Sequence, residues 1–241
     1  MADHSTNDAT PRPTADRSRR AAFVISLICA AQFVLQLDFS IVNVALPSVQ
    51  RELGMPAADL QWIVTGYALA FGSLLLAGGR LADLLGRRQM LTVGLALFGI
   101  ASLACGLAQS PIMLIIARIV QGVAGAMVSP AALSLLTTTH AEGAARNRAL
   151  AIWQATTAAG ATAGIVAGGL LTQYFGWRAV FLINPPVIAL MLALVPGGAG
   201  REPGPPPRPP PCQGGGGGGG APPPGPGDGA GLRREPARPR R

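Results

Sequence analysis

Two charged side chains, Asp38 and Arg118, stand within long stretches of this sequence that are otherwise apolar. An ionisable group at membrane depth is a functional candidate by default, because leaving it unpaired is costly. Counted at about 1.5 Å per residue along their helices, the two lie at depths that differ by about one helical turn. An arginine side chain spans that difference, so we expect Asp38 and Arg118 to interact directly or through a polar neighbour such as Asn43 or Gln121.

The chemistry open to this pair is reversible protonation. Protonating Asp38 would neutralise the carboxylate and weaken its pairing with Arg118, which suits a switch driven by protons. The sequence leaves two alternatives open: a structural ion pair that joins two helices, or two residues that line water independently of each other.

A second set of functional candidates lies in the short segment 79–88, which joins two apolar stretches. Asp83 and Arg87 are four residues apart and can pair on one helical turn, while Gly79 and Gly86 permit a tight turn and close packing. The arginines of this segment, Arg88 among them, favour a position on the cytoplasmic side of a membrane. Topological anchoring needs only the arginines and leaves the glycine and aspartate spacing unexplained.

Glycines recur at helical spacing in two other stretches. Gly160, Gly164 and Gly168 follow one another at intervals of four, with Gly169 beside the last, and Gly122 gives an earlier stretch a similar small surface. Such a track lets another backbone approach closely. It indicates either tight packing alone or flexibility during a conformational cycle.

The elements that must position these residues are membrane-spanning helices. Charged residues make up only 12% of the chain and apolar residues 49%, and a soluble protein of this composition would expose large apolar patches. A stretch of about 20 apolar residues is long enough to cross a bilayer as a helix. The sequence predicts an all-α integral membrane bundle, 21–195, with spans at 21–45, 60–78, 90–107, 111–137, 150–175 and 179–195.

The two ends of the chain differ from this bundle. Residues 1–20 are polar and are expected to form a disordered arm, which the arginines of the loops place in the cytoplasm. Residues 196–241 are rich in proline, glycine and arginine, and they are also expected to be disordered. This tail is either a natural flexible segment or the product of a frameshift.

Several functional classes are disfavoured. The net charge of +8 comes from arginines at the termini and in short loops, not on one helix face, so no nucleic-acid partner is expected. The three cysteines show no metal-ligand spacing, and Ser129 and Ser134 have no neighbouring base in the sequence. We therefore expect no metal, no cofactor and no enzyme activity.

The motifs above resemble those of the major facilitator superfamily. Segment 79–88 resembles its signature between helices 2 and 3, and segment 114–122, with Arg118, Gln121 and Gly122, resembles its helix 4 motif, which is associated with proton coupling. Segment 160–169 resembles the helix 5 antiporter motif, with an isoleucine in place of its proline. Segment 37–47 is similar to the helix 1 signature of the fourteen-helix drug:proton antiporter branch.

The resemblance covers residues 21–195 and implies the six-helix N-terminal half of a major facilitator fold. It implies a transporter in the cell membrane that exports hydrophobic or cationic small molecules, such as drugs or antibiotics, using the proton gradient. Asp38 and Arg118 would couple protons, and candidate pocket residues are Gln36, Asn43, Trp62, Tyr67, Trp153 and Gln154.

In that family the helix 2–3 segment latches against a second half, which is not visible in this sequence. A lone half would need a separate second half or a homodimer to give alternating access. The alternative function is therefore a non-transporting half that needs a partner half.

Overall fold

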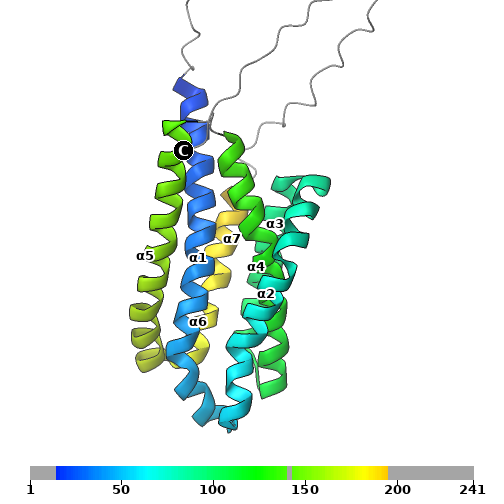
Figure 1. Ribbon diagram of the computed structural model, residues 1–241. Helices are drawn as coiled ribbons and strands as arrows, with labels where there is room; N and C mark the ends of the chain where they lie inside the picture. Colours follow the sequence, from blue (N-terminus) through cyan, green and yellow to red (C-terminus); the bar gives the residue numbers. More distant parts are fainter. Residues whose placement is uncertain (1–14, 140–142, 195–241) are drawn as a thin grey trace, which may run out of the picture. The chain divides into compact units, whose positions relative to one another are not determined.

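The computed structural model describes residues 15–139 and 143–194, and these residues form helices without any strand (Figure 1). The predicted tail at 196–241 and most of the predicted N-terminal arm lie outside the described residues. The helices, in chain order, are α1 (Ala15–Leu53), α2 (Ala57–Leu85), α3 (Arg87–Gly106), α4 (Pro111–Thr139), α5 (Ala144–Phe175), α6 (Trp177–Leu182) and α7 (Asn184–Leu194).

Six segments are long and apolar enough to cross a membrane, with α6 and α7 sharing the last. The predicted all-α membrane architecture of six spans is thus confirmed. The boundaries differ, because α1 runs from Ala15 to Leu53 where the sequence predicts a span at 21–45 and an arm at 1–20. Hydropathy marks where a helix is apolar, whereas its backbone hydrogen bonds can continue into polar residues at both ends.

The last span is broken where the sequence predicts one helix. Ile183 lies between α6 and α7, and Pro185 and Pro186 follow at the start of α7. A proline has no N–H to donate to the carbonyl four residues earlier. The carbonyls of Phe181 and Leu182 therefore lose their helical donors, which accounts for the interruption.

Two one-residue connections use glycine in a conformation that other residues rarely adopt. Gly86 joins α2 to α3 with φ +96°, and Gly176 joins α5 to α6 with φ +79°. The predicted turn at Gly86 is therefore present. Gly79 instead lies inside α2, and the close helix contact belongs to its neighbour Gly78, where an added Cβ would lie 2.2 Å from the carbonyl oxygen of Ala126.

The glycine track of α5 packs against the backbone of α1. An added Cβ would lie 2.8 Å from the carbonyl oxygen of Phe33 at Gly160, 2.7 Å from that of Leu37 at Gly164, and 3.0 Å from that of Ile41 at Gly168. Each step of four residues on α5 matches a step of four on α1, so the two helices run parallel and side by side (Figure 1).

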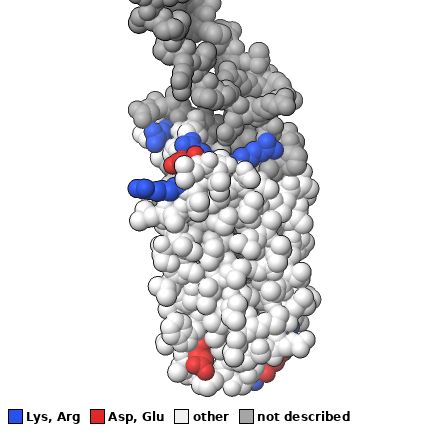
Figure 2. All heavy atoms as spheres, turned by 90° about the vertical axis from the view of Figure 1, so that its right-hand side faces the viewer, with Lys and Arg blue, Asp and Glu red and all other residues white. Residues whose placement is uncertain are grey.

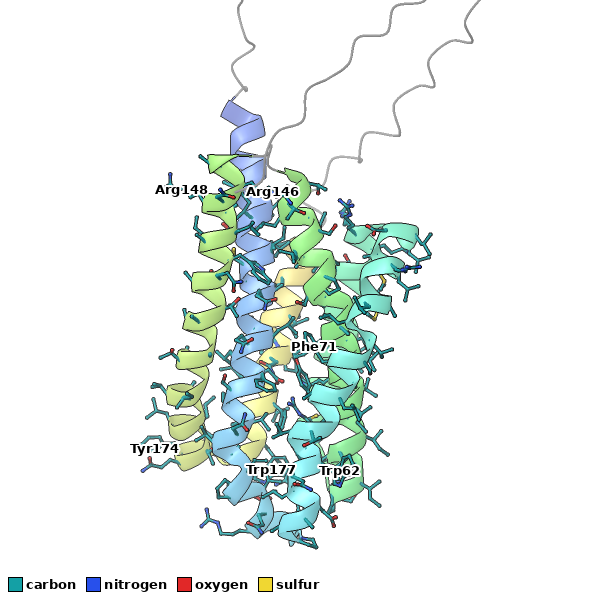
Figure 3. All side chains as sticks on the ribbon, in the orientation of Figure 1. Trp62, Phe71, Arg146, Arg148, Tyr174 and Trp177 are labelled. Carbon is teal, nitrogen blue, oxygen red and sulfur yellow. The ribbon has the colours of Figure 1, made fainter. Side chains whose placement is uncertain are left out.

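The two ends of the bundle differ in chemistry. Figure 3 shows Arg146 and Arg148 at one end, called here the arginine end, and Trp62 and Trp177 at the other, the tryptophan end. Figure 2 shows one face of the bundle, with charged side chains near its ends and a broad uncharged band between them. Trp177 is fully buried and its Nε1 donates to Glu52 at 2.8 Å, so it packs inside the bundle and does not face lipid.

The apolar core consists of two clusters that are stacked along the bundle. One includes Ile28 and Val34 of α1 and Leu91 and Phe98 of α3. The other includes Ile41 and Val49 of α1, Cys105 of α3, and Trp177 and Phe181 of α6. Between them lies a layer of buried polar side chains that comprises Asp38, Ser102, Arg118, Gln121 and Asn184.

The contact between α1 and α5 predicts opposite effects for two neighbouring glycines. Gly164→Ala places a methyl group against Leu37 and should lower the free energy of unfolding by about 1–3 kcal/mol, as overpacking does. Gly169→Ala meets no atom within 4 Å and should leave stability unchanged or raise it by up to about 1 kcal/mol. Thermal unfolding in detergent measures both; equal effects would contradict the close contact.

Candidate functional site

Asp38 of α1 and Arg118 of α4 form an ion pair at the centre of the polar layer. Nη1 of Arg118 donates to Oδ2 of Asp38 at 2.6 Å, and both side chains are fully buried. The contact expected from the depths of the two residues is therefore present. Its role in proton coupling stays a prediction.

Two amides complete the environment of the carboxylate. Gln121, one turn after Arg118, donates through Nε2 to Oδ1 of Asp38 at 3.0 Å and accepts from Nη1 of Arg118 at 2.8 Å. Asn184 of α7 donates through Nδ2 to the same Oδ1 at 2.7 Å. Ser102 of α3 accepts from Gln121 at 2.6 Å. Four helices therefore meet at one carboxylate.

The guanidinium of Arg118 is held on α2 as well. Its Nε donates to the carbonyl oxygen of Ile63 at 3.2 Å, and its Cζ lies 4.3 Å from the ring centroid of Tyr67 and 5.9 Å from that of Phe181. Aromatic faces attract cations at such distances. Nη2 of Arg118 has no hydrogen-bond partner among the described residues, so this nitrogen of the guanidinium is a buried donor that is left unsatisfied.

This arrangement surrounds the Asp38 carboxylate with hydrogen-bond donors. The carboxylate accepts hydrogen bonds from Arg118, Gln121 and Asn184, and it faces donors only. A buried charge is tolerated when it is paired and hydrogen-bonded, and it becomes costly when its partner is lost. Arg118 bonds to Asp38 and to Gln121, so the loss of charge on Asp38 would leave the guanidinium without its one carboxylate partner among the described residues.

A cavity of about 230 Å³ lies beside this layer, between α1, α2 and α4. Its aromatic wall is formed by Phe39, Tyr67 and Phe71, with the ring of Tyr67 stacked 6.1 Å from that of Phe71; Figure 3 shows Phe71 at mid-height of the bundle. Its polar wall includes Gln32, whose buried Oε1 has no hydrogen-bond partner among the described residues. Tyr67 belongs to both sites, because it lines the cavity and packs against Arg118.

The candidate pocket residues are divided by the structure. Gln36 and Tyr67 line the cavity. Asn43 does not bridge the ion pair; it is exposed and donates to the carbonyl oxygen of Phe39 in its own helix at 2.8 Å. Trp62 is exposed near the tryptophan end, while Trp153 is half-buried against the core and Gln154 is exposed. Spacing alone could not separate the cavity-lining face of each helix from its other faces.

The segment between α2 and α3 lies apart from the ion pair, at the same end of the bundle as the start of α5 (Figure 1). Nη2 of Arg87 donates to Oδ1 of Asp83 at 3.2 Å, which is the pairing expected from their spacing. Arg88 is half-buried. Gly122 of α4 packs near the cavity, where an added Cβ would lie 2.4 Å from the carbonyl oxygen of Tyr67.

Sequence reasoning missed Ser102, Asn184 and Cys105, whose Sγ donates to Oε1 of Gln121 at 3.5 Å. Asn184 carried a signal, because apart from the prolines it is the sole residue of the predicted span 179–195 that is not apolar. Gln32 and Phe71 could also have been recognised, because Gln32 lies four residues before Gln36 and Phe71 four residues after Tyr67, on the same helix face as these expected pocket residues. Within the described residues, no three His, Cys, Asp or Glu side chains come together as a metal site requires.

The buried ion pair predicts strong coupling between its two members. Asp38→Asn and Arg118→Gln should each lower the free energy of unfolding by about 3–5 kcal/mol, because each leaves a buried charge unpaired. The double variant should lose less than the sum of the two. The exposed pair offers a control, since Asp83→Asn should cost less than about 1 kcal/mol. Unfolding of the purified variants by titration with a denaturing detergent measures these free energies. If the loss in the double variant equalled the sum of the two single losses, the charges would not be coupled.

The chain is similar to known proteins in both sequence and fold. The chain is 49% identical over 166 residues to the puromycin resistance protein pur8 of Streptomyces alboniger, a match that covers 69% of this chain and 33% of that protein. It is 42% identical over 202 residues to the cephamycin export protein CmcT of Amycolatopsis lactamdurans, covering 83% and 42% respectively. The chain therefore spans about a third to two fifths of the length of these relatives.

The fold has a counterpart among solved transporters. A bacterial homologue of the human lysosomal transporter Spinster, in an inward-facing and occupied conformation, matches with a TM-score of 0.62 and 20% sequence identity, over 72% of this chain and 43% of that one. The family model of the Major Facilitator Superfamily matches residues 28–236. With six apolar spans, a matching transporter fold and this family match, the chain belongs to the Major Facilitator Superfamily.

Proposed function

We propose that the protein serves proton-coupled export of hydrophobic or cationic small molecules, with Asp38 and Arg118 as the proton-coupling pair. The observation that carries the proposal is the position of Tyr67, whose side chain both packs against Arg118 of the ion pair and lines the cavity. A change in either site therefore reaches the other through one aromatic ring.

The physical link between proton and substrate is the charge of Asp38. When Asp38 is ionised, Arg118 is drawn to it and holds Tyr67 on its other side. When Asp38 is protonated, Arg118 loses its counter-charge and keeps only the carbonyl of Ile63 and the aromatic faces around it. Two ligands that favour different arrangements of one element oppose each other's binding, which is the thermodynamic requirement for antiport.

The cavity supports the proposed class of substrate. Three aromatic rings and the aliphatic Leu35 make up half of its eight lining residues, and Gln32 and Gln36 add amide groups. Flat apolar molecules stack on such rings, and cations are attracted to their faces. Relatives whose names state resistance to puromycin and to lincomycin, and export of cephamycin, are in keeping with this proposal.

The orientation follows from the distribution of arginine. The arginine end, with Arg146 and Arg148, should face the cytoplasm, because positive residues are retained on that side. On this proposal, the start of α1 and the α2–α3 segment would lie on the cytoplasmic side of the plasma membrane. Apolar side chains exposed on its flanks, such as Leu76 and Ile112, would contact lipid.

A second half of the transport site is part of the proposal, because the chain spans less than half the length of the relatives it matches. Substrate sites of this family lie between two halves, and a second half or a second copy would complete the cavity beside Tyr67. The competing function is a non-transporting half that acts only with such a partner.

Neutralising the proposed proton site should abolish coupling. Asp38→Asn keeps the size of the side chain but cannot exchange a proton, so uptake of ethidium into inside-out vesicles should no longer respond to an imposed proton gradient. Asp83→Asn, which changes an exposed carboxylate away from the site, should keep that response. Gradient-driven uptake by Asp38→Asn would refute the coupling role, while a wild-type chain that is inactive alone and active with a second half would favour the non-transporting alternative.

The aromatic wall makes a separate prediction about binding. Phe71→Ala removes a stacking surface worth about 0.5–1.5 kcal/mol, so the dissociation constant for ethidium should rise about 2- to 10-fold. Phe175→Ala removes an exposed ring at the end of α5 and should leave binding unchanged. Fluorescence titration of the purified protein measures both, and equal effects would exclude the cavity as the binding site.

A further inference from the structure

Asn184 occupies a special place in the polar layer. It is the first residue of α7, follows the break at Ile183 and is almost fully buried. Its side chain reaches across to α1, where Nδ2 donates to Oδ1 of Asp38 at 2.7 Å, and lies 3.4 Å from Oγ of Ser102 on α3. The break in the last span thus places an amide against the proton-exchanging carboxylate.

A protonated Asp38 has a requirement that the observed arrangement does not meet. The ionised carboxylate only accepts hydrogen bonds, and Arg118, Gln121 and Asn184 all donate to it. A neutral carboxyl group carries an O–H and needs an acceptor. One of its neighbours must therefore turn an oxygen toward it, because a buried donor without a partner is costly.

Of the two amides, Asn184 is the one that can turn. Gln121 is held at both ends, since its Nε2 donates to Asp38 and Ser102 while its Oε1 accepts from Arg118. Reversing it would point its NH₂ group at the guanidinium. Asn184 makes both of its described hydrogen bonds through Nδ2, so half a turn about its Cβ–Cγ bond exchanges a donor for an acceptor at the same place.

We propose that Asn184 is a positioning residue that sets the pH at which Asp38 exchanges its proton. Its Nδ2 donates to the ionised carboxylate; after a proton arrives from water, its rotated Oδ1 accepts from the carboxyl O–H. The hydroxyl of Ser102, which already accepts a hydrogen bond from Gln121, then donates one to the Oδ1 of Asn184. This deepens the proposed function by naming what regulates its proton site, and it applies to the chain whether or not transport occurs.

The other titratable groups around Asp38 are few. Arg118 faces it from α4, and Tyr67 of α2 and Cys105 of α3 are near enough to interact with it electrostatically. On α5 and α6 the titratable side chains lie near the helix ends, at Arg146, Arg148, Tyr174 and Arg178, and α7 has none. Asn184 is thus the contribution of α7 to this site.

Infrared titration of the 241-residue chain in lipid tests the proposal. The carbonyl stretch of the protonated carboxyl group reports the protonation of Asp38, and the band that disappears in Asp38→Asn identifies it. Asn184→Leu removes a bond to the charged form that is about twice as strong as the bond to the neutral form. The midpoint should therefore move to higher pH by about one unit, a tenfold gain in proton affinity.

Asn43→Leu is the matched control, because Asn43 lies on α1 but bonds only to its own helix. Its midpoint should equal that of the wild type. An unmoved midpoint in Asn184→Leu, or a move to lower pH, would overturn the proposal.

A second measurement leaves Asn184 in place, in case its substitution prevents folding. Replacing Asn7, Asn43 and Asn147 by glutamine leaves Asn184 as the single asparagine of the sequence, which can then be labelled with ¹³C in its side-chain carbonyl. That band should shift with the same midpoint as the Asp38 band. A band that stays constant through the titration would show that the amide does not turn.

These readouts separate the two proposals. A shifted midpoint in Asn184→Leu without gradient-driven uptake by the wild type would sink the transport function and leave the role of Asn184 intact. Gradient-driven uptake together with an unmoved midpoint would sink the role of Asn184 alone.

Discussion

The structure depends on one requirement: a carboxylate and a guanidinium that are both buried away from water must form an ion pair. Asp38 and Arg118 are fully buried and 2.6 Å apart, and the residues that share their layer complete their hydrogen bonds. Two apolar clusters lie on either side of this layer along the bundle. A rotation of α1 by one residue position would move Asp38 off Arg118 and leave both charges unpaired, so the pair fixes the rotation of its helices.

Glycine fixes the second parameter, the distance between helices. Gly164 brings the backbone of α5 against α1 at Leu37, beside Asp38 itself, and Gly122 brings α4 against α2 at Tyr67. The close approach of backbones supplies packing where the apolar surroundings offer no hydrophobic driving force between helices. The charges thus specify which faces meet, and the glycines specify how closely they meet.

The features that the sequence predicted correctly are those that depend on local composition. Six apolar spans follow from hydropathy, and the Asp38–Arg118 contact follows from the rarity of charge at depth. The features that it missed depend on tertiary packing. Trp177 lies at the tryptophan end of the bundle yet is fully buried, and its Nε1–H donates a hydrogen bond to Glu52 of α1. Likewise Gly78 makes the close contact and Gly79 does not, which only the crossing point of α2 and α4 decides.

The residues of the cavity show the same limit. Gln36 and Tyr67 were recognisable as polar or amphipathic side chains in apolar spans, but Trp62 and Gln154 have the same character and face outward. Composition identifies such residues, and the relative rotation of helices decides which of them share a site. That rotation is set by the ion pair, whose partners are 80 residues apart in the sequence.

The contacts between the helices differ in whether an ionic charge takes part in them. At Gly160, Gly164 and Gly168, α5 packs directly on the backbone of α1, and at Gly78 and Gly122 the helices α2 and α4 approach each other in the same way. Between α1 and α4 the closest polar contact is the ion pair itself. If Asp38 lost its charge, the contact between α1 and α4 would weaken while the glycine contacts within the α1–α5 and α2–α4 pairs would remain, so the bundle would loosen along the boundary between the two pairs.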